Sequence, residues 1–367
     1  DAFDAPARLA MTNAAAQTDH DAEVVALLSA EEFARVQSFA RSQQVATNAV
    51  IEAAWALCLG RRSNHSDVSF GVAVAGRDAN IAGIERMVGL TINNLPLRVK
   101  LNESTPVSDW LKSVHDAQSE QQQFAHVSLA SIQQWSNVPW RTRLFETLLV
   151  FQHDDAEQRT SAWLGRGLTT ELQHVPTRTA YPLSIMVAGT DSLEFRVTFD
   201  ARYFNEQEAG ALATALRDAT VALATQTNAT VGDVLSALPV LANALTHEVD
   251  ASVPVVAPRT ATESVLARIW SEVLGAEHIG VHDDFFRLGG YSLVATQIVS
   301  RIRSTLKTDA PVRLLFQHPT IATLATALAA RDKKPGQLER IAQVVQRVQS
   351  MSLDEVRRAS EARVVTN

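Results

Sequence analysis

The stretch "DDFFRLGGYSLVATQIVSRIR" runs from Asp283 to Arg303 and decides how the C-terminal part of the chain folds. It begins with two acids and two aromatic residues, reaches the pair Gly289 and Gly290, and continues with apolar residues at helical spacing. Paired glycines permit a tight turn, and the pattern after them predicts a helix. Ser292 is therefore expected at, or within one residue of, the start of that helix.

Two roles for Ser292 follow from these residues. It can be an ordinary N-cap, which is the commoner role of a serine at a helix start. It can also carry a phosphate ester, because the free N–H groups and the positive end of the helix dipole favour an anion there. The residues by themselves leave both roles open.

The chain around this stretch divides into parts of different composition. Three helical patterns, at 262–274, 292–305 and 320–330, occur without any strand pattern and predict a small all-α domain, a four-helix bundle. Apolar residues at helical spacing continue in a tail, at Leu338, Ile341, Val344, Val345 and Val348. The predicted division is a large domain at 1–240, a linker at 241–258, the bundle at 259–332 and a helical tail at 333–367.

The large domain shows strand and helix patterns in alternation, which predicts an α/β fold with a mixed sheet. Ser29 and Glu32 have the spacing of a capping box, and Thr47 and Asn205 are further candidate caps. Predicted strands are 22–28, 68–75, 91–99 with a break at Pro96, 145–151, and a hairpin turning at 189–192. One predicted helix begins at Ser29, and three others cover 48–60, 107–125 and 205–225.

Composition excludes several functions. The chain has 367 residues, is 46% hydrophobic and carries a net charge of -7, which argues against nucleic-acid binding. The one cysteine, Cys58, cannot form a disulfide within the chain, and with scattered histidines it makes no zinc site. The sequence shows no membrane span, signal peptide or glycine-rich phosphate loop, so a cytoplasmic protein without ATP binding is expected. It opens on Asp1 rather than Met, so the natural start is expected upstream.

The stretch that contains Ser292 resembles the carrier motif of nonribosomal peptide synthetases, Asp-x-Phe-Phe-x-Leu-Gly-Gly-(His/Asp)-Ser-Leu. The matching residues are Asp284, Phe285, Phe286, Leu288, Gly289, Gly290, Ser292 and Leu293, whereas Tyr291 departs from the pattern. The resemblance covers about 258–330. It implies that a separate phosphopantetheinyl transferase esterifies Ser292 with 4'-phosphopantetheine from coenzyme A, and that the arm carries an aminoacyl or peptidyl thioester. The two phenylalanines and Leu288 are expected to pack the loop on the bundle.

Residues 67–101, 144–152 and 181–187 resemble motifs in the C-terminal lobe of a condensation domain. The resemblance implies a chloramphenicol-acetyltransferase-like fold, with the active site in a tunnel between this lobe and an N-terminal lobe. The family's His-His-x-x-x-Asp-Gly motif belongs to that other lobe and is absent from this sequence. We therefore expect no catalytic residue and no activity in this chain alone, which is expected to begin between the lobes. Its expected partners are the N-terminal lobe, an upstream donor carrier, and an adenylation domain that acts in trans or has been lost.

Three polar residues, Arg77, Asn93 and Arg98, are candidates for the tunnel wall. Each also has a structural explanation: the arginines pair with nearby acids, and Asn93 satisfies backbone groups where the strand is broken. His126 is expected at the surface, and Tyr181 in packing. His153 lies in "FQHDDAE", which lacks the spacing of the catalytic motif.

Other interpretations remain open. The chain can be a non-catalytic carrier and docking module, or its small domain can be the acyl carrier of a hybrid polyketide–peptide assembly line. The large domain can also belong to an epimerization domain, although "MVGLTINNLPLRV" favours condensation. The basic, amphipathic tail at 336–367 can pack on its own carrier or dock a downstream protein.

Overall fold

The structure is a computed structural model of the chain. It describes residues 21–77, 81–89, 91–138, 142–152, 181–201, 203–226, 228–239, 241, 255–276, 279–286, 288, 290, 292–332 and 334–350. These residues form two compact units, one built around a β-sheet and one around helices of the C-terminal part. Each unit is described by itself.

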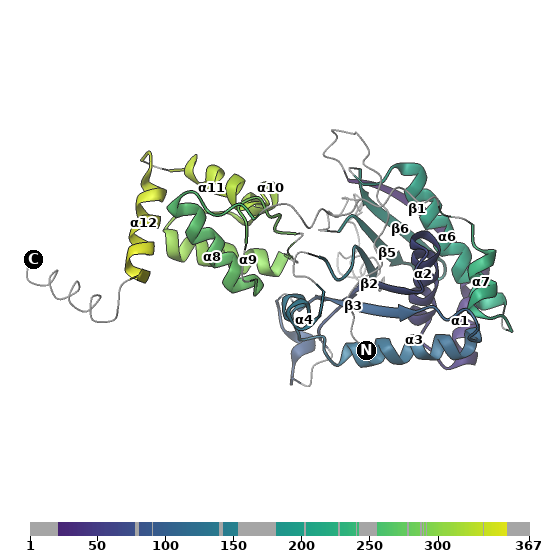
Figure 1. The fold of residues 1–367 in the computed structure, drawn as a ribbon. Helices are drawn as coiled ribbons and strands as arrows, with labels where there is room; N and C mark the ends of the chain where they lie inside the picture. Colours follow the sequence, from purple (N-terminus) through teal and green to yellow (C-terminus); the bar gives the residue numbers. More distant parts are fainter. Residues whose placement is uncertain are drawn as a thin grey trace, which may run out of the picture. The chain divides into compact units, whose positions relative to one another are not determined.

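The sheet has six strands in the order β1-β6-β5-β4-β2-β3 (Figure 1). The strands are β1 (Asp21–Leu28), β2 (Asp67–Val74), β3 (Asn93–Lys100), β4 (Thr147–Phe151), β5 (Leu183–Ala188) and β6 (Leu193–Asp200). β4 pairs in parallel with β2 and β5, and the remaining pairs are antiparallel. The predicted mixed sheet is therefore confirmed.

Helices accompany this sheet in chain order. They are α1 (Ala30–Gln43), α2 (Thr47–Ser63), the 3-10 turn η1 (Ile84–Arg86), α3 (Val107–Gln122), α6 (Glu206–Thr225) and α7 (Val231–Ala237). The short helix α4 (Leu129–Trp135) belongs, from Ala130 on, to the second unit. α2, α3 and α6 contact strands of the sheet, and Figure 1 shows them on one side of it. This arrangement is the layered α/β fold that alternating patterns predict.

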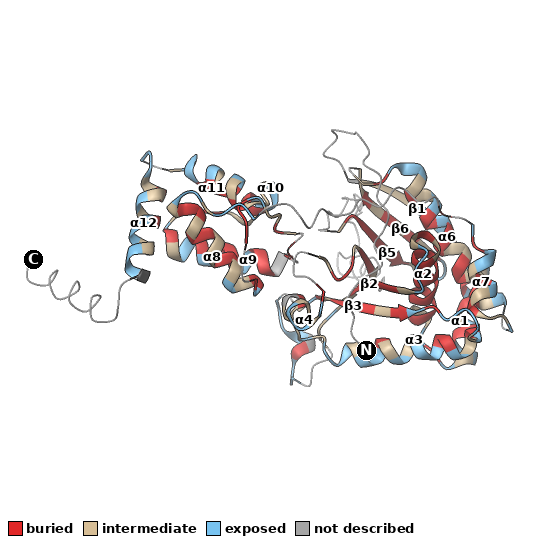
Figure 2. Cartoon of the chain, viewed as in Figure 1, coloured by how far each residue is buried: buried red, intermediate tan, exposed pale blue. Residues whose placement is uncertain are grey.

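Helix α2 is the centre of this core. Figure 2 shows it buried along most of its length, as expected for a helix that is apolar on all sides. Trp55 is fully buried, and its indole N–H donates to Thr147 Oγ1 at 3.1 Å, which ties α2 to β4. Cys58 is also fully buried, and burial raises the pKa of its thiol.

Helix starts that depend on near neighbours are predicted correctly. Ser29 and Asn205 both form complete capping boxes, with Glu32 and Glu208 as their partners. The prediction for Thr47 is wrong, because Ala46 is the N-cap and Thr47 is the first helical residue. The helix therefore starts without a side-chain cap, and burial of α2 stabilises it instead.

The predicted break at Pro96 is also wrong. β3 is continuous, and Pro96 pairs in register with Gly71 of β2. β3 is the last strand of the sheet, with a described neighbour on one side. Proline lacks a backbone N–H, and an edge strand tolerates that loss because one side of it makes no ladder hydrogen bonds.

The C-terminal unit is a bundle of helices. It contains α8 (Ala261–Leu274), α9 (Ser292–Leu306), α10 (Val312–Gln317), α11 (Ile321–Ala329) and α12 (Gln337–Ser350). Sequence patterns predict α8, α9 and α11 to within two residues but miss the six-residue α10. α12 was expected in a separate tail, but it packs on α8 and α9. The described bundle therefore has five helices, one more than the predicted four-helix bundle.

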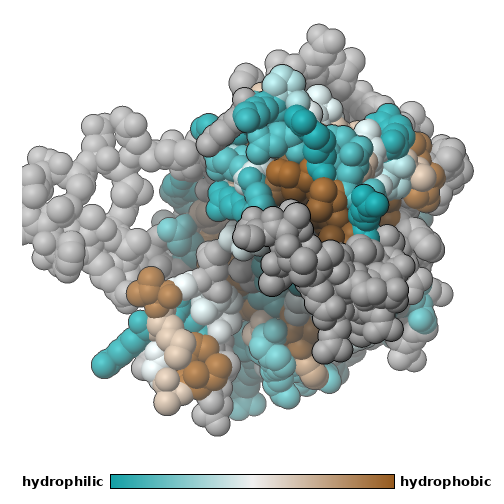
Figure 3. All heavy atoms as spheres, turned by 90° about the vertical axis from the view of Figure 1, so that its left-hand side faces the viewer, coloured by the Kyte–Doolittle hydropathy of each residue, from teal (hydrophilic) through white to brown (hydrophobic). Residues whose placement is uncertain are grey.

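Hydrophobic surface is dispersed on the face drawn in Figure 3, where brown patches lie within a largely hydrophilic surface. Among the exposed large apolar side chains of the described residues, Ile81, Val88 and Ile92 lie between β2 and β3. None of the described helices is both long and apolar enough to cross a membrane. The described residues also contain no group of metal-ligating side chains.

Candidate functional site

The predicted start of the helix at Ser292 is confirmed. α9 begins at Ser292, and its first turn, Ser-Leu-Val-Ala, contains no acidic residue. The first N–H groups of a helix have no intrahelical partner and carry the positive end of the dipole. A phosphodiester at this position would therefore meet hydrogen-bond donors and no nearby negative charge within that turn. The start of α9 fits an esterified anion.

The loop before α9 is held by its own backbone. The N–H of Leu288 donates to Asp284 O at 3.0 Å, and the N–H of Gly290 donates to Phe285 O at 2.9 Å. The Asp284 carboxylate accepts from the N–H of Phe286 at 2.9 Å. The N–H of Phe285 also donates to Pro319 O at 2.7 Å, which joins the loop to the segment before α11. These bonds define where α9 can begin.

Aromatic packing holds the same loop on the bundle. Phe285 is fully buried, with its ring 5.5 Å from that of Trp270 and 5.0 Å from that of Phe286. Phe286 in turn lies 5.4 Å from Phe316. Leu288 is also buried, so the predicted packing role of these loop residues is confirmed. Phe316 itself is 41% exposed, so this aromatic row reaches the surface.

Gly290 is required for space. A Cβ at this position would lie 2.4 Å from two atoms of the Phe285 ring and 2.5 Å from the Phe285 carbonyl oxygen. Real Cβ atoms do not come so close, so any side chain would displace either the ring or the backbone. Gly290 therefore permits the buried ring of Phe285 to lie directly under the turn. Gly289 and Tyr291 lie outside the described residues, and so do the side chains of Ser292 and Leu293.

Gly290→Ala is expected to destabilise the helical unit by about 1–3 kcal/mol, the usual cost of overpacking a core. Denaturant unfolding that follows this unit would measure it. Gly210→Ala is the matched control, because Gly210 lies in α6 with open space where an alanine Cβ would be, and alanine favours helix. Equal stability of the parent and Gly290→Ala would mean that the loop is looser than the structure shows.

The three tunnel candidates of the large unit take part in structural bonds. The Arg77 guanidinium donates to the carbonyl oxygens of Ile84 and Met87 at 2.8 and 2.9 Å. Its described partners are thus carbonyl groups, not the acid that sequence suggested. These bonds brace the segment between β2 and β3. Arg98 does pair with an acid, Asp67 on β2, through Nη2 at 2.6 Å.

Asn93 satisfies backbone groups, one of the two roles considered from the sequence, although the strand is not broken there. Its amide Nδ2 donates to Ala125 O and Val127 O at 2.9 and 2.6 Å, and its Oδ1 accepts from the N–H of Asn94 at 2.9 Å. The side chain thus joins the start of β3 to the segment after α3. Both polar atoms of the Asn93 side chain therefore have structural partners.

The remaining candidates have simple roles. His126 is exposed, as predicted. Tyr181 stacks on Phe145 with ring centroids 5.1 Å apart, which confirms the packing role. His153 lies outside the described residues.

Sequence reasoning missed a buried acid in the large unit. Glu52 on α2 is fully buried, and its Oε1 accepts from the Gln118 amide of α3 at 2.9 Å. Its Oε2 has no hydrogen-bond partner among the described residues. The signal was present, because Glu52 is the only charged residue in the apolar run "AVIEAAWALCLG". Burial raises the pKa of this carboxyl to about 8, against the lowering effect of the Gln118 hydrogen bond.

The chain thus combines an α/β unit with a mixed sheet and a helical unit with a serine at a helix start. The model of the Condensation domain family matches residues 4–245, and that of the Phosphopantetheine attachment site matches residues 264–328. The chain belongs to the condensation-domain family, and its second part is a carrier domain whose covalent cofactor is 4'-phosphopantetheine. This pair of domains marks it as part of a nonribosomal peptide synthetase.

Similar curated proteins are much longer than this chain. Chondramide synthase cmdD of Chondromyces crocatus is 42% identical over 167 residues, which cover 46% of this chain and 4% of that protein. Tyrocidine synthase 2 of Brevibacillus parabrevis is 33% identical over 173 residues, covering 46% of this chain and 5% of that protein. The chain therefore spans only a small part of these relatives.

Solved structures support the fold. The X-domain in its complex with OxyB from teicoplanin biosynthesis is 20% identical with a TM-score of 0.53, over 65% of this chain and 53% of that one. A four-domain nonribosomal peptide synthetase bound to AMP and glycine is 12% identical with a TM-score of 0.52, over 63% of this chain and 19% of that one. At these identities the likeness concerns the fold alone.

Proposed function

We propose that Ser292 is the residue to which the 4'-phosphopantetheine arm is attached, and that the chain presents a thioester-bound aminoacyl or peptidyl group for amide-bond formation. The observation that carries this proposal is the start of α9 at Ser292, within the part matched by the attachment-site model. The loop residues Asp284, Phe285, Phe286, Leu288 and Gly290 support it by fixing that helix start. Gly289 and Leu293 belong to the same proposed motif.

The arm, when attached, supplies a flexible thiol that holds the cargo as an activated acyl group. The chain's own residues would position its phosphate, because N–H groups at the start of α9 could donate to it and the helix dipole would favour its charge. The loop before α9 keeps these donors in place. Ser292 itself carries the cargo and catalyses no step of amide formation.

The large unit contributes one wall of the condensation tunnel in this proposal. Bringing the amine and the thioester together in a defined orientation can lower a barrier by about 7–11 kcal/mol at most. Arg77, Asn93 and Arg98 act as positioning residues, because their bonds hold the segments around β3 in place. The chain lacks the His-His-x-x-x-Asp-Gly motif, so we infer that it forms no amide without the lobe that carries it.

Attachment is tested by intact mass spectrometry after incubation with coenzyme A and a promiscuous phosphopantetheinyl transferase. We expect the mass to rise by one arm. If a folded sample kept the unmodified mass after this incubation, the carrier role would be refuted.

Condensation is tested by supplying the N-terminal lobe as a separate protein, together with loaded donor and acceptor carriers. We expect amide product only when that lobe is present. Product from this chain alone would mean that it contains catalytic residues elsewhere. No product in either case would favour a second candidate, a non-catalytic carrier and docking module.

The proposed partners follow from this role. They are a phosphopantetheinyl transferase, the N-terminal condensation lobe, an upstream donor carrier and an adenylation domain acting in trans. A downstream protein can dock on the tail at 336–367, where Val344 and Val348 remain exposed on α12.

The single cysteine suits a reducing compartment, and we place the protein in the cytoplasm, without membrane or nucleic-acid partners.

A further inference from the structure

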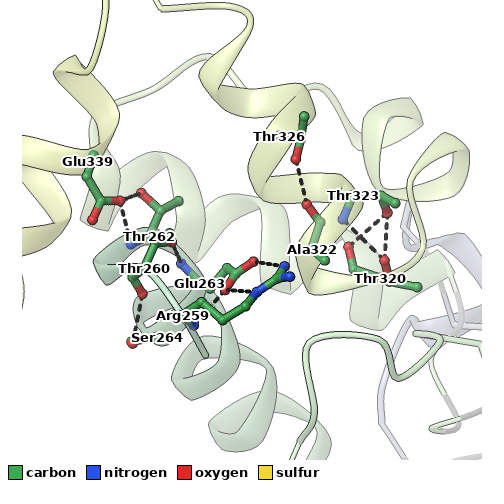
Figure 4. Close-up of polar contacts among 10 residues, drawn as sticks. All are labelled: Arg259, Thr260, Thr262, Glu263, Ser264, Thr320, Ala322, Thr323, Thr326 and Glu339. Carbon is green, nitrogen blue, oxygen red and sulfur yellow. Dashed lines mark hydrogen bonds and ion pairs between the residues drawn. The ribbon is translucent and has the colours of Figure 1, made fainter. Parts of the chain in front are cut away.

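The N-terminus of α8 is completed by a residue far along the chain. A helix leaves its first N–H groups without intrahelical partners. In α8 the N–H of Ala261 donates to Glu339 Oε1 at 2.8 Å. The N–H of Thr262 donates to Glu339 Oε2 at 3.0 Å (Figure 4). The next N–H, of Glu263, donates to the hydroxyl of the N-cap Thr260 at 3.1 Å. Both oxygens of Glu339 are thus used by α8.

Glu339 is presented by α12, a well-defined helix. Leu338 and Ala342 are buried on its inner side, and Asp332 caps its start by accepting from the N–H of Leu338 at 3.0 Å. Burial would raise the pKa of Glu339, but hydrogen bonds from Thr262 and Ala261 bring it below its usual value. Its carboxylate is therefore charged at neutral pH and lies at the positive end of the α8 dipole.

Glu339 also binds the side chain of Thr262, whose Oγ1 donates to Oε2 at 2.6 Å. This contact lies close in the chain to Arg259 and Thr260, where the polypeptide enters the bundle. Arg259 itself pairs with Glu263 at 2.6 Å (Figure 4). The entry of the chain into the helical unit and its exit through α12 therefore meet at one polar cluster.

We propose that the helical unit contains an intramolecular docking site for this chain's own α12, formed by the N-terminus of α8 and the apolar surface beside it, and that Glu339 is the residue this site recognises. α12 lies beyond residues 264–328, the extent of the attachment-site match. The site binds an amphipathic helix that has a carboxylate at its third residue, as α12 has at Glu339. Release of α12 leaves two N–H groups of α8 unpaired and exposes Leu338 and Ala342, so docking of α12 and order in the first turn of α8 are coupled. This inference is independent of arm attachment.

Hydrogen exchange on the full chain, followed by mass spectrometry, tests the coupling. Glu339→Gln has nearly the same shape but places an amide NH2 group opposite backbone donors. We expect exchange to become about tenfold faster or more in both α12 and the first turn of α8, because hydrogen bonds to a charged group are lost together. Glu272→Gln is the matched control on the exposed side of α8, where Glu272 pairs with Arg301. This control should leave exchange in both segments unchanged.

Three results would overturn the proposal. The first is faster exchange in one of the two segments while the other keeps its protection. The second is no change in either segment in Glu339→Gln, with a far-UV circular dichroism spectrum like that of the parent. The third is a dimeric parent on size-exclusion chromatography that becomes monomeric in Glu339→Gln, because the site would then hold α12 of a second copy.

Discussion

Ser292→Ala is expected to abolish attachment of the 4'-phosphopantetheine arm completely, so that the intact mass stays that of the unmodified chain after incubation with coenzyme A and transferase. The phosphodiester forms at the serine hydroxyl oxygen, and alanine has none. α9 should persist, because alanine is a strong helix former and losing a serine at a helix start costs about 0.5–2 kcal/mol. The loss of loading would therefore be chemical and not a consequence of unfolding.

The matched control for this experiment is Ser300→Ala. Ser300 lies further along the same helix and is exposed. The Ser300→Ala variant should gain one arm, as the parent does. Loading that persists in Ser292→Ala would assign the arm to a different hydroxyl and refute the proposed site, even with the carrier function retained.

Glu52→Gln is expected to make the sheet unit more stable at pH 8, on the order of 4 kcal/mol. The Glu52 carboxyl is buried, with one oxygen bonded to Gln118 and the other without a described partner. Ionising it in this setting is costly, and its pKa is raised from 4.5 to about 8. Glutamine keeps the shape and an acceptor for Gln118, and it has no charge to bury.

The sign of the pH dependence follows from linkage. Between pH 4.5 and about 8 the folded chain holds a proton on Glu52 that the unfolded chain releases, so stability falls as pH rises. Each pH unit in this window lowers the free energy of unfolding by about 1.4 kcal/mol. Below pH 4.5 this contribution is fully present, and above about pH 8 the loss is complete.

Denaturant unfolding at pH 5, 7 and 8 measures this difference. The parent should lose stability across the series, and the gap to Glu52→Gln should widen with pH. Glu31→Gln on α1 is the control, because the Glu31 side chain is 84% exposed. If the gap between the parent and Glu52→Gln were the same at pH 5 and pH 8, the buried carboxyl would not be held in its protonated form.

Local patterns were sufficient for much of the fold. The capping boxes at Ser29 and Asn205 join residues three positions apart, so the sequence displays both partners. The hairpin of β5 and β6 is likewise local, and its turn at 189–192 was predicted correctly. The mixed sheet followed from the alternation of such segments. Thr47 and Pro96 show the limit, because the start of α2 and the tolerance of proline in β3 depend on burial and on position in the sheet.

The sequence by itself determined the carrier motif, the position of Ser292 at a helix start and the family of both domains, because these depend on residues close together in the chain. Only the tertiary structure decided that Gly290 must leave room for Phe285, that Glu52 is buried against Gln118, and that Glu339 completes α8. Glu52 lies 66 residues from Gln118, and Glu339 lies 78 from Ala261. Whether a carboxyl at such a position is charged, neutral or a helix cap depends on neighbours that folding brings together, and no local pattern contains them.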